Sequence, residues 1–385
     1  MTEKEAYVAF NLTEQIGSVK VADLTLKYGS VAAAWEAWPK KVSRTGGEVD
    51  WRAEFKKAER FGVAILTPAD PEYPMLLRDA PGRPLCLYVK GDPAALSKPS
   101  LAIVGTRRTT PYGADQAFKL GRDLAAAGWC IVSGLALGVD AEAHKGALEA
   151  GGATVGVLGS GLDQFYPEEN RALAREIVKS GGAVVSEFPF GRTPDTQTFP
   201  QRNHVVAALV RGVVAVECPV KSGTLITTGI AADLGRTVMA IPGRVDSRSS
   251  AGCLKLIRDG ARLVRNARDV EEEMRELMPS KAGSESGGRT QSAASRRADT
   301  SRGASGSAPA VPAPPPRRAP CPKPPFSIEE AMVMKHVDAE GVSVDALIER
   351  TGLPAMKVNA VCMTLRVKGR VRFFPGNRVA LPRAD

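Results

Sequence analysis

The feature that most constrains this chain is a regular alternation of short Val-rich runs and longer helical stretches between Ser100 and residue 264. The runs are LAIVG, CIVSG, TVGVLG, AVVSE, GVVAVE, TVMAI and ARLV. Uninterrupted apolar strands that alternate with helices are typical of a parallel sheet with helices on both faces. The sequence therefore predicts an α/β domain with a Rossmann-like, doubly wound parallel sheet.

Small residues and two cations follow the predicted strands. In α/β sheets, ligands bind beyond the carboxyl ends of the strands, where the free N–H groups of helix N-termini suit anions. A tight turn would explain any one of these segments, but their repetition at successive strand ends favours a shared site. The pattern predicts a phosphate-binding groove made of Gly105, Thr106, Arg107, Ser133, Gly134, Lys221, Ser222, Gly223 and Thr224.

Neither a nucleotide cofactor nor a metal ion is expected. The turns GTRRTT and GSGLDQ lack the last glycine of the dinucleotide fingerprint, and no P-loop motif GxxxxGK[ST] occurs. The six cysteines are scattered without a CxxC pair, which favours buried free thiols in a reducing cytoplasm over a disulfide framework or a zinc site. Asp140 and His144 lie four residues apart on one helix face, but we expect His144 to pack or to cap. We expect no catalytic residue.

The first 325 residues divide into three predicted parts. Residues 1–60 are mostly helical, with Trp35, Trp38 and Trp51 as expected core aromatics, and predict a small SAM-like accessory domain. Residues 61–280 hold the predicted sheet and form the Rossmann-like domain. Residues 281–325 contain nine Pro and seven Ser, with eight basic residues against two acidic ones, and predict a disordered linker. Because the linker carries most of the net charge of +10, that charge is weak evidence for a nucleic-acid partner.

Residues 326–385 have the spacing of three short helices followed by a β-hairpin around Pro375-Gly376-Asn377, which is typical of a winged-helix domain. Five basic residues lie near the hairpin without an acidic residue among them: Arg366, Lys368, Arg370, Arg372 and Arg378. Such a surface suits phosphates, but winged helices also dock to proteins, so both kinds of partner stay open. The linker is likewise either a plain tether or one that also holds nucleic acid loosely.

Hydropathy gives no sign of a membrane protein. No apolar run approaches the roughly 18 residues that a membrane helix needs. The opening MTEKEAYVAF has neither the basic start nor the apolar core of a signal peptide. The composition, 43% hydrophobic and 24% charged, is close to the globular average. The sequence therefore predicts a cytoplasmic protein with no membrane span.

Seven motifs in order resemble those of the DNA-processing protein A family, also called DprA or Smf. They are AIVGTRRTTPYG, SGLALGVDAEAHKGAL, VLGSGLDQFYPEEN, SEFPFG, FPQRN, SGTLITTGIAADLGR and IPGRVDSRSSAGCLKLIRDGA. The resemblance covers roughly residues 60–275. The resemblance implies a cytoplasmic homodimer that binds single-stranded DNA and loads the RecA recombinase in natural transformation and homologous recombination. It also accounts for a variable N-terminal helical domain and a C-terminal winged helix.

The resemblance also implies roles for individual residues. Gly105, Thr106 and Arg107 match the family motif that grips backbone phosphates. The FPxRN motif corresponds to residues 199–203, and within it Phe199, Gln201, Arg202 and Asn203 are the expected nucleic-acid contacts. An exposed Phe199 would stack on a base, which is a sequence-tolerant contact. Two departures from the family pattern are His204, where a further Arg is usual, and the run Cys253-Leu254-Lys255, where the family commonly has Asn before the Leu-Ile pair.

Two other classes of function stay open. The fold also resembles nucleoside-monophosphate phosphoribohydrolases, whose PGGxGTxxE signature ends in a glutamate needed for N-glycosidic cleavage. Aligning that signature on Gly223 and Thr224 places Thr227 at the glutamate position. A hydroxyl cannot replace a carboxylate in stabilising the cationic sugar, so we expect no enzyme. A transcription regulator acting through the winged helix would instead prefer duplex DNA, and competition between single-stranded and duplex DNA separates the two.

Overall fold

The computed structural model describes residues 1–13, 16–39, 42–44, 46–275, 328–338, 341–367, 370–374 and 378–381. The chain forms two compact units, Met1–Ser286 and Gly287–Asp385, which we describe separately. The predicted linker 281–325 and the predicted turn 375–377 lie outside the described residues. Whether residues 1–60 form a domain of their own stays a prediction.

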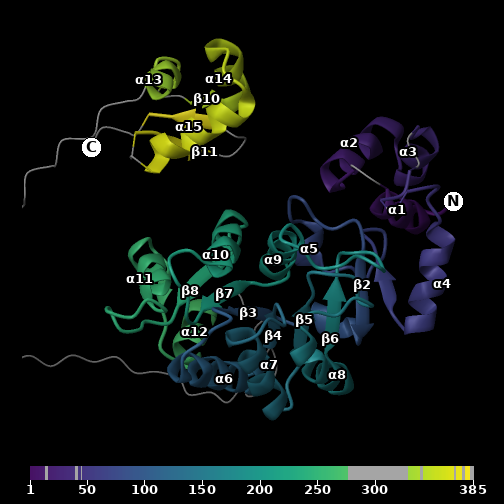
Figure 1. Cartoon of the computed structure of the whole chain (residues 1–385), viewed down its shortest axis with the longest axis vertical. Helices are drawn as coiled ribbons and strands as arrows, with labels where there is room; N and C mark the ends of the chain where they lie inside the picture. The colour runs from purple at the N-terminus through teal and green to yellow at the C-terminus, as the bar shows by residue number, and fades with distance from the viewer. Residues whose placement is uncertain are drawn as a thin grey trace, which may run out of the picture. The chain divides into compact units, whose positions relative to one another are not determined.

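The first unit is built on a mixed sheet with seven parallel strands, as the sequence predicts for residues 100–264 (Figure 1). Among the described residues the strand order is β1-β2-β6-β5-β4-β3-β7-β8-β9. The two strands at one end of the sheet, β1 and β2, were not predicted. They pair antiparallel with each other, and β2 pairs antiparallel with β6. The strands are β1 (Ala64–Leu66), β2 (Leu87–Gly91), β3 (Ser100–Val104), β4 (Cys130–Ser133), β5 (Thr154–Val157), β6 (Ala183–Ser186), β7 (Gly212–Ala215), β8 (Thr237–Ala240) and β9 (Arg262–Leu263).

Helices cover both faces of this sheet, so the inner strands β3 to β7 are buried on both sides and read as continuous apolar runs. One layer contains α6, α7, α8 and α12, and the other contains α9, α10 and α11 (Figure 1). The helices are α5 (Met75–Arg78), α6 (Pro111–Ala126), α7 (Val139–Glu149), α8 (Arg171–Lys179), α9 (Thr198–Ala208), α10 (Gly223–Asp233), α11 (Ala251–Arg258) and α12 (Ala267–Met274).

The strand order reverses beside β3. The chain builds β4, β5 and β6 on one side of this strand, and then crosses through α9 to add β7, β8 and β9 on its other side. At such a switch point the connections after β3 and β7 leave in opposite directions, which opens a crevice at the carboxyl ends of both strands. The fold therefore places the turns after Val104 and Ala215 side by side.

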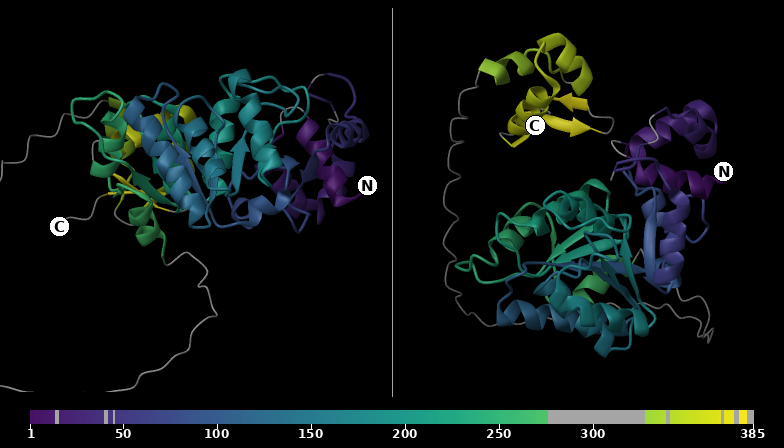
Figure 2. Two further views of the ribbon diagram at one scale, coloured as in Figure 1. Left: turned by 90° about the horizontal axis from the view of Figure 1, so that it is seen from below. Right: turned by 45° about the vertical axis from the view of Figure 1, so that its right-hand side comes forward.

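The N-terminal helices pack against the β1 and β2 edge of the sheet (Figure 2). They are α1 (Glu3–Leu12), α2 (Ser18–Tyr28), α3 (Val31–Ala37) and α4 (Trp51–Phe61). Trp35 is buried beside Phe10, and Trp38 and Trp51 are partly buried. The same cluster includes residues of β1, β2 and the SEFPFG motif, so this bundle shares its core with the sheet edge. No helix in the described residues is long and apolar enough to cross a membrane.

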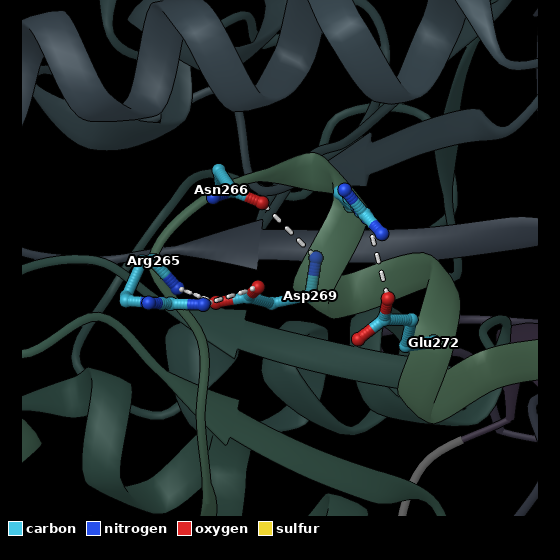
Figure 3. Close-up of polar contacts among 5 residues, drawn as sticks. Arg265, Asn266, Asp269 and Glu272 are labelled. Carbon is cyan, nitrogen blue, oxygen red and sulfur yellow. Dashed lines mark hydrogen bonds and ion pairs between the residues drawn. The ribbon is translucent and has the colours of Figure 1, made fainter.

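The last helix of the first unit, α12, is fixed at its N-terminus by a compact set of polar contacts (Figure 3). Asn266 caps the helix, because its Oδ1 accepts from the Asp269 amide at 3.0 Å. Arg265 binds both carboxylate oxygens of Asp269, from Nε at 2.8 Å and from Nη2 at 3.0 Å. Val270 and Met274 are buried against the sheet. The helix ends at Met274, close to residue 280, where the Rossmann-like domain was predicted to end.

The second unit contains α13 (Ile328–Met334), β10 (Val342–Ser343), α14 (Val344–Thr351), α15 (Ala355–Val367), β11 (Arg372–Phe374) and β12 (Arg378–Ala380). The three strands form a small antiparallel sheet in the order β10-β12-β11. Ser343 caps α14, because its Oγ accepts from the Ala346 amide at 3.2 Å. Leu347, Val358 and Leu365 are buried in its core. These elements confirm the predicted winged helix.

Candidate nucleic-acid interface

A cavity of about 300 Å³ opens at the switch point, where β3, β4 and β7 end. It is lined by the turns after these strands, by one face of α9 and by the start of α10. Every predicted site residue except Ser133 and Gln201 lies on its wall: Gly105, Thr106, Arg107, Gly134, Phe199, Arg202, Asn203, Lys221, Ser222, Gly223 and Thr224. Turns far apart in the sequence thus converge on one surface, as the parallel sheet requires.

An arginine and an aromatic ring stand together at the mouth of this cavity. The Arg107 guanidinium carbon lies 4.7 Å from the centroid of the Phe199 ring. Tyr166 packs near the same ring at 6.1 Å. Phe199 is half-buried, so it is less exposed than the sequence suggested. Arg107 is exposed, and it forms no ion pair with a carboxylate in the described part of the chain. Its charge is therefore available to a ligand.

The turn that carries Arg107 is braced by a carboxylate at the end of β7. Glu217 accepts hydrogen bonds from Thr109 Oγ1, from the amide and the hydroxyl of Thr110, and from Ser249 Oγ, at 2.8–2.9 Å. Its backbone carbonyl accepts from the Thr106 amide at 2.7 Å. Burial raises the pKa of Glu217, but the hydrogen bonds from these donors outweigh burial and hold it below its usual value. The turn is fixed before any ligand arrives.

A second arginine forms the floor of the cavity. Arg202 is 5% exposed, and its Nη1 donates to the Val157 carbonyl at 3.1 Å. Burial lowers the pKa of this guanidinium, while the charge of Asp140 opposes the shift. Asp140 in turn accepts from the amides of Gly134 and Ala136 at 3.1 and 3.4 Å. A Cβ atom at Gly134 would lie 1.5 Å from Arg202 Nη1, so only glycine leaves room for the guanidinium.

The N-terminus of α10 supplies the opposite wall. Ser222 stands at the N-cap position without a side-chain cap bond, so the first amides of the helix remain available to an anion. Lys221 is exposed directly before it and forms no ion pair in the described part of the chain. Asn203 Nδ2 donates to the Gly223 carbonyl at 3.5 Å and links α9 to this turn. The wall combines a cation with a helix N-terminus.

Two predicted residues lie elsewhere. Ser133 is fully buried, and its hydroxyl donates to the Ile103 carbonyl at 2.6 Å inside the sheet. Gln201 is exposed on the other face of α9, where it lines a separate cavity of about 250 Å³ together with His204. The His204 Nε2 atom lies 2.9 Å from the Pro81 carbonyl. The cavity at the switch point therefore has no direct contribution from Ser133 or Gln201.

The structure also shows cavity residues that the sequence reasoning did not select. Asp140 lines the cavity, although the sequence drew attention to it only as a neighbour of His144 on one helix. Thr227 also lines the cavity, although the sequence drew attention to it only as the residue at the glutamate position of the phosphoribohydrolase signature. Tyr166 is not on the cavity wall, but its ring lies beside Phe199, and its only sequence signal is its place in the VLGSGLDQFYPEEN motif. His144 itself is fully buried with Nδ1 2.7 Å from Thr154 Oγ1, so it packs as expected. No cluster of possible metal ligands occurs within the described residues.

The mixed sheet with helices on both faces and a switch point beside β3 defines a Rossmann-like α/β protein. Comparison with known proteins shows its family. Residues 64–275 match the family of the DNA recombination-mediator protein A, and residues 309–377 match the DprA winged helix domain. The chain therefore belongs to the DNA recombination-mediator protein A family, which confirms the resemblance seen in its motifs.

Individual relatives agree with this assignment. Protein Smf of Synechocystis sp. is 35% identical over 281 residues, which cover 68% of this chain and 70% of that protein. The X-ray structure of DNA processing protein A from Streptococcus pneumoniae is 33% identical with a TM-score of 0.60, over 71% of this chain and 98% of that one. DNA processing protein A from Helicobacter pylori, described for its unique single-stranded DNA binding mode, is 30% identical with a TM-score of 0.50, over 56% and 97%.

Proposed function

We propose that this protein binds single-stranded DNA in the cavity at the switch point. The observation that carries the proposal is the pairing of Arg107 with Phe199 at the cavity mouth, at 4.7 Å from guanidinium carbon to ring centroid. A single strand offers phosphates and unpaired bases in alternation, and it is bound by cations next to aromatic platforms. The related protein from Helicobacter pylori supports this choice of ligand.

Each wall of the cavity has a distinct part in this proposal. Arg107 and Lys221 contact backbone phosphates, and the first amides of α10 receive a further phosphate oxygen. Phe199 stacks on a base when Arg107 turns from the ring to a phosphate. Arg202 is buried and already bonded to the Val157 carbonyl, so it contributes only the positive potential of its charge to the floor. Phosphate contacts and stacking are independent of base identity, so binding tolerates any sequence.

From family membership we further infer the biological setting of this binding. The chain passes the bound strand to the RecA recombinase, and it acts as a cytoplasmic homodimer in natural transformation and homologous recombination. The family description as a recombination mediator supports this role. Acceleration of RecA filament formation on a DNA strand coated with single-strand-binding protein tests it. Equal rates with and without the protein would remove the RecA step and leave the DNA-binding step standing.

The same geometry argues against cleavage of nucleotides. Thr227 takes the position of the catalytic glutamate in the phosphoribohydrolase signature, and its hydroxyl donates to the Gly223 carbonyl at 3.2 Å. The one carboxylate on the cavity wall is Asp140, which is buried and held by two backbone amides. We therefore propose that the protein is not an enzyme. Release of free base from nucleoside monophosphates by purified protein would contradict this.

A competition titration tests the DNA-binding proposal directly. A labelled oligo-dT is bound to full-length protein, and unlabelled single-stranded or duplex DNA is added at two salt concentrations. We expect the single strand to displace the probe at much lower concentration, because a duplex keeps its bases stacked and unavailable to Phe199. Equal competition by duplex DNA would favour the winged helix as the binding site and would overturn the proposal.

A further inference from the structure

A second concave surface, which we call the α8 groove, lies beside α8 and shares no residue with the DNA cavity. It encloses about 350 Å³. Its floor is apolar and is formed by Phe61, Val63, Leu158, Leu162, Phe165, Ala174, Val178, Val184 and Phe190. Its remaining lining residues are the four cations Lys90, Arg171, Arg175 and Lys179, with no acidic residue among them. The proposed DNA-binding function uses none of these side chains.

The floor of the α8 groove is held in place by backbone hydrogen bonds to two carboxylates, of which the bond to Glu54 is buried. The Phe190 amide donates to Glu54, which is 3% exposed, at 2.9 Å, and the Gly191 amide donates to Asp163 at 2.8 Å. The ring of Phe190 stacks on Phe61 with centroids 5.4 Å apart. Phe61 nevertheless remains 43% exposed. A contiguous apolar surface with charged side chains at its rim is typical of an interaction site.

The cations of the α8 groove form a row. Arg171, Arg175 and Lys179 are spaced four residues apart and therefore share one face of α8, over about 12 Å of helix. Arg171 is bound to Glu168 at 2.6 Å, and Lys90 donates to the Phe61 carbonyl. Arg175 and Lys179 are exposed and form no ion pair in the described residues. Two exposed cations that form no ion pair thus flank an apolar floor.

We propose that the α8 groove binds an acidic peptide segment of a partner protein through at least one large apolar side chain. The apolar side chain fills the floor, and neighbouring carboxylates meet the row of cations. Roughly four residues of extended chain span the 12 Å of the row. A nucleobase suits this floor less well, because its apolar side chains leave the polar edge of a base without hydrogen-bond partners. The acidic, apolar helix α12 of this chain is not available, since Val270 and Met274 are buried.

Fluorescence anisotropy with full-length protein tests this proposal. The probe is a fluorescein-labelled peptide of sequence GDEDDLF, and a matched peptide carries Ser in place of its Leu and Phe. The double variant Arg175→Glu with Lys179→Glu is expected to bind the probe at least about tenfold more weakly. The control variant Lys98→Glu with Arg258→Glu makes the same change in net charge at exposed positions outside the α8 groove, and binds like the wild type.

Three results would overturn the proposal. The first is equal binding of the probe by both double variants, and the second is equal binding of the Ser-substituted peptide. The third is displacement of the probe by oligo-dT together with a matching loss of oligo-dT affinity in the α8 variant, which would make the α8 groove part of the nucleic-acid path. Arg107→Ala keeps peptide binding under the proposal, so failure of the DNA-binding function is seen separately.

Discussion

The mouth and the floor of the switch-point cavity each hold an arginine, and the two arginines differ in exposure and in the groups they contact. Arg107 at the mouth is exposed and rests on Phe199. Arg202 in the floor is 5% exposed and bonded to the Val157 carbonyl. An exposed cation exchanges partners at little cost, whereas a buried one depends on fixed partners that offset its desolvation. The difference teaches that burial decides whether an arginine serves binding or stability.

The largest expected effect is that of Arg202→Ala on stability. The change leaves Asp140 buried without an opposing charge and the Val157 carbonyl without its donor, so the free energy of unfolding falls by about 3–5 kcal/mol. Urea unfolding followed by tryptophan fluorescence measures it. Arg107→Ala is the matched control, and it stays within about 0.5 kcal/mol of wild type because its side chain is exposed. An Arg202→Ala variant as stable as wild type would end the distinction between mouth and floor.

Phe199→Ala should weaken oligo-dT binding by about 1–3 kcal/mol, since it removes the stacking platform at the mouth. The dependence of affinity on salt stays unchanged, because stacking releases no counterions. Phe199→Trp keeps a platform and retains binding. A large fall in melting temperature without loss of affinity would show instead that the half-buried ring belongs to the core.

We expect acid to lower the free energy of unfolding through the buried residue His144. Burial and the nearby charge of Arg202 lower the pKa of His144 to about 3. Below about pH 6.5 the unfolded chain binds a proton that the folded chain excludes, so stability falls as the pH drops from 6.5 towards 3. Between pH 7 and pH 5 this residue accounts for about 2 kcal/mol. Urea unfolding of wild type and of His144→Gln at pH 7 and pH 5 measures the contribution of His144. If both proteins lose the same stability between these pH values, His144 is not the cause of the loss.

Arg107→Ala should lower the slope of log affinity against log salt by about 0.7, which is the single-strand value for one neutralised phosphate. Arg107→Lys keeps the slope but loses the two-pronged contact of the guanidinium, and so binds more weakly than wild type. Anisotropy titrations with poly-dT at several salt concentrations, with thermal melts, measure both. An unchanged slope with a lowered melting temperature would make Arg107 a brace of the turn.

The smallest expected effect comes from removing residues 281–385. Because the cavity lies wholly in the first unit, the affinity for single-stranded DNA falls by less than about tenfold, or 1.4 kcal/mol, at near-physiological salt. An electrophoretic titration of residues 1–280 against the full chain measures this. A larger loss would place the principal site in the linker or the winged helix and would make the cavity secondary.

The parallel strands of the sheet were predictable from their apolar runs, whereas the antiparallel strands β1 and β2 were missed. Val-rich runs marked β3 to β8 because an inner parallel strand has no solvent-facing side. The strands β1 and β2 carry a weaker signal: β1 has three residues, and β2 ends in exposed Lys90 and Gly91. Their antiparallel pairing also needs no helix between them, so the alternating pattern does not include them.

Sequence reasoning located the cavity but could not rank its residues. Glycine-rich strand ends predicted the rim, because topology alone brings them together. The burial of Arg202 depends on space left by Gly134, a contact between distant parts of the chain that no local pattern reveals. Gln201 could have been excluded from the cavity wall. It lies two residues after Phe199 on α9, which places it on the other side of the helix.

The carboxylate of Glu217 has a consequence for when the rim can work. The carboxylate lies next to the proposed DNA-binding surface, and its oxygens accept hydrogen bonds from Thr109, Thr110 and Ser249. These bonds fail only when the carboxyl group takes up a proton, and its pKa lies below the usual value. Glu217 therefore keeps these hydrogen bonds in mildly acidic solution, and the turn that carries Arg107 keeps its shape as the pH falls.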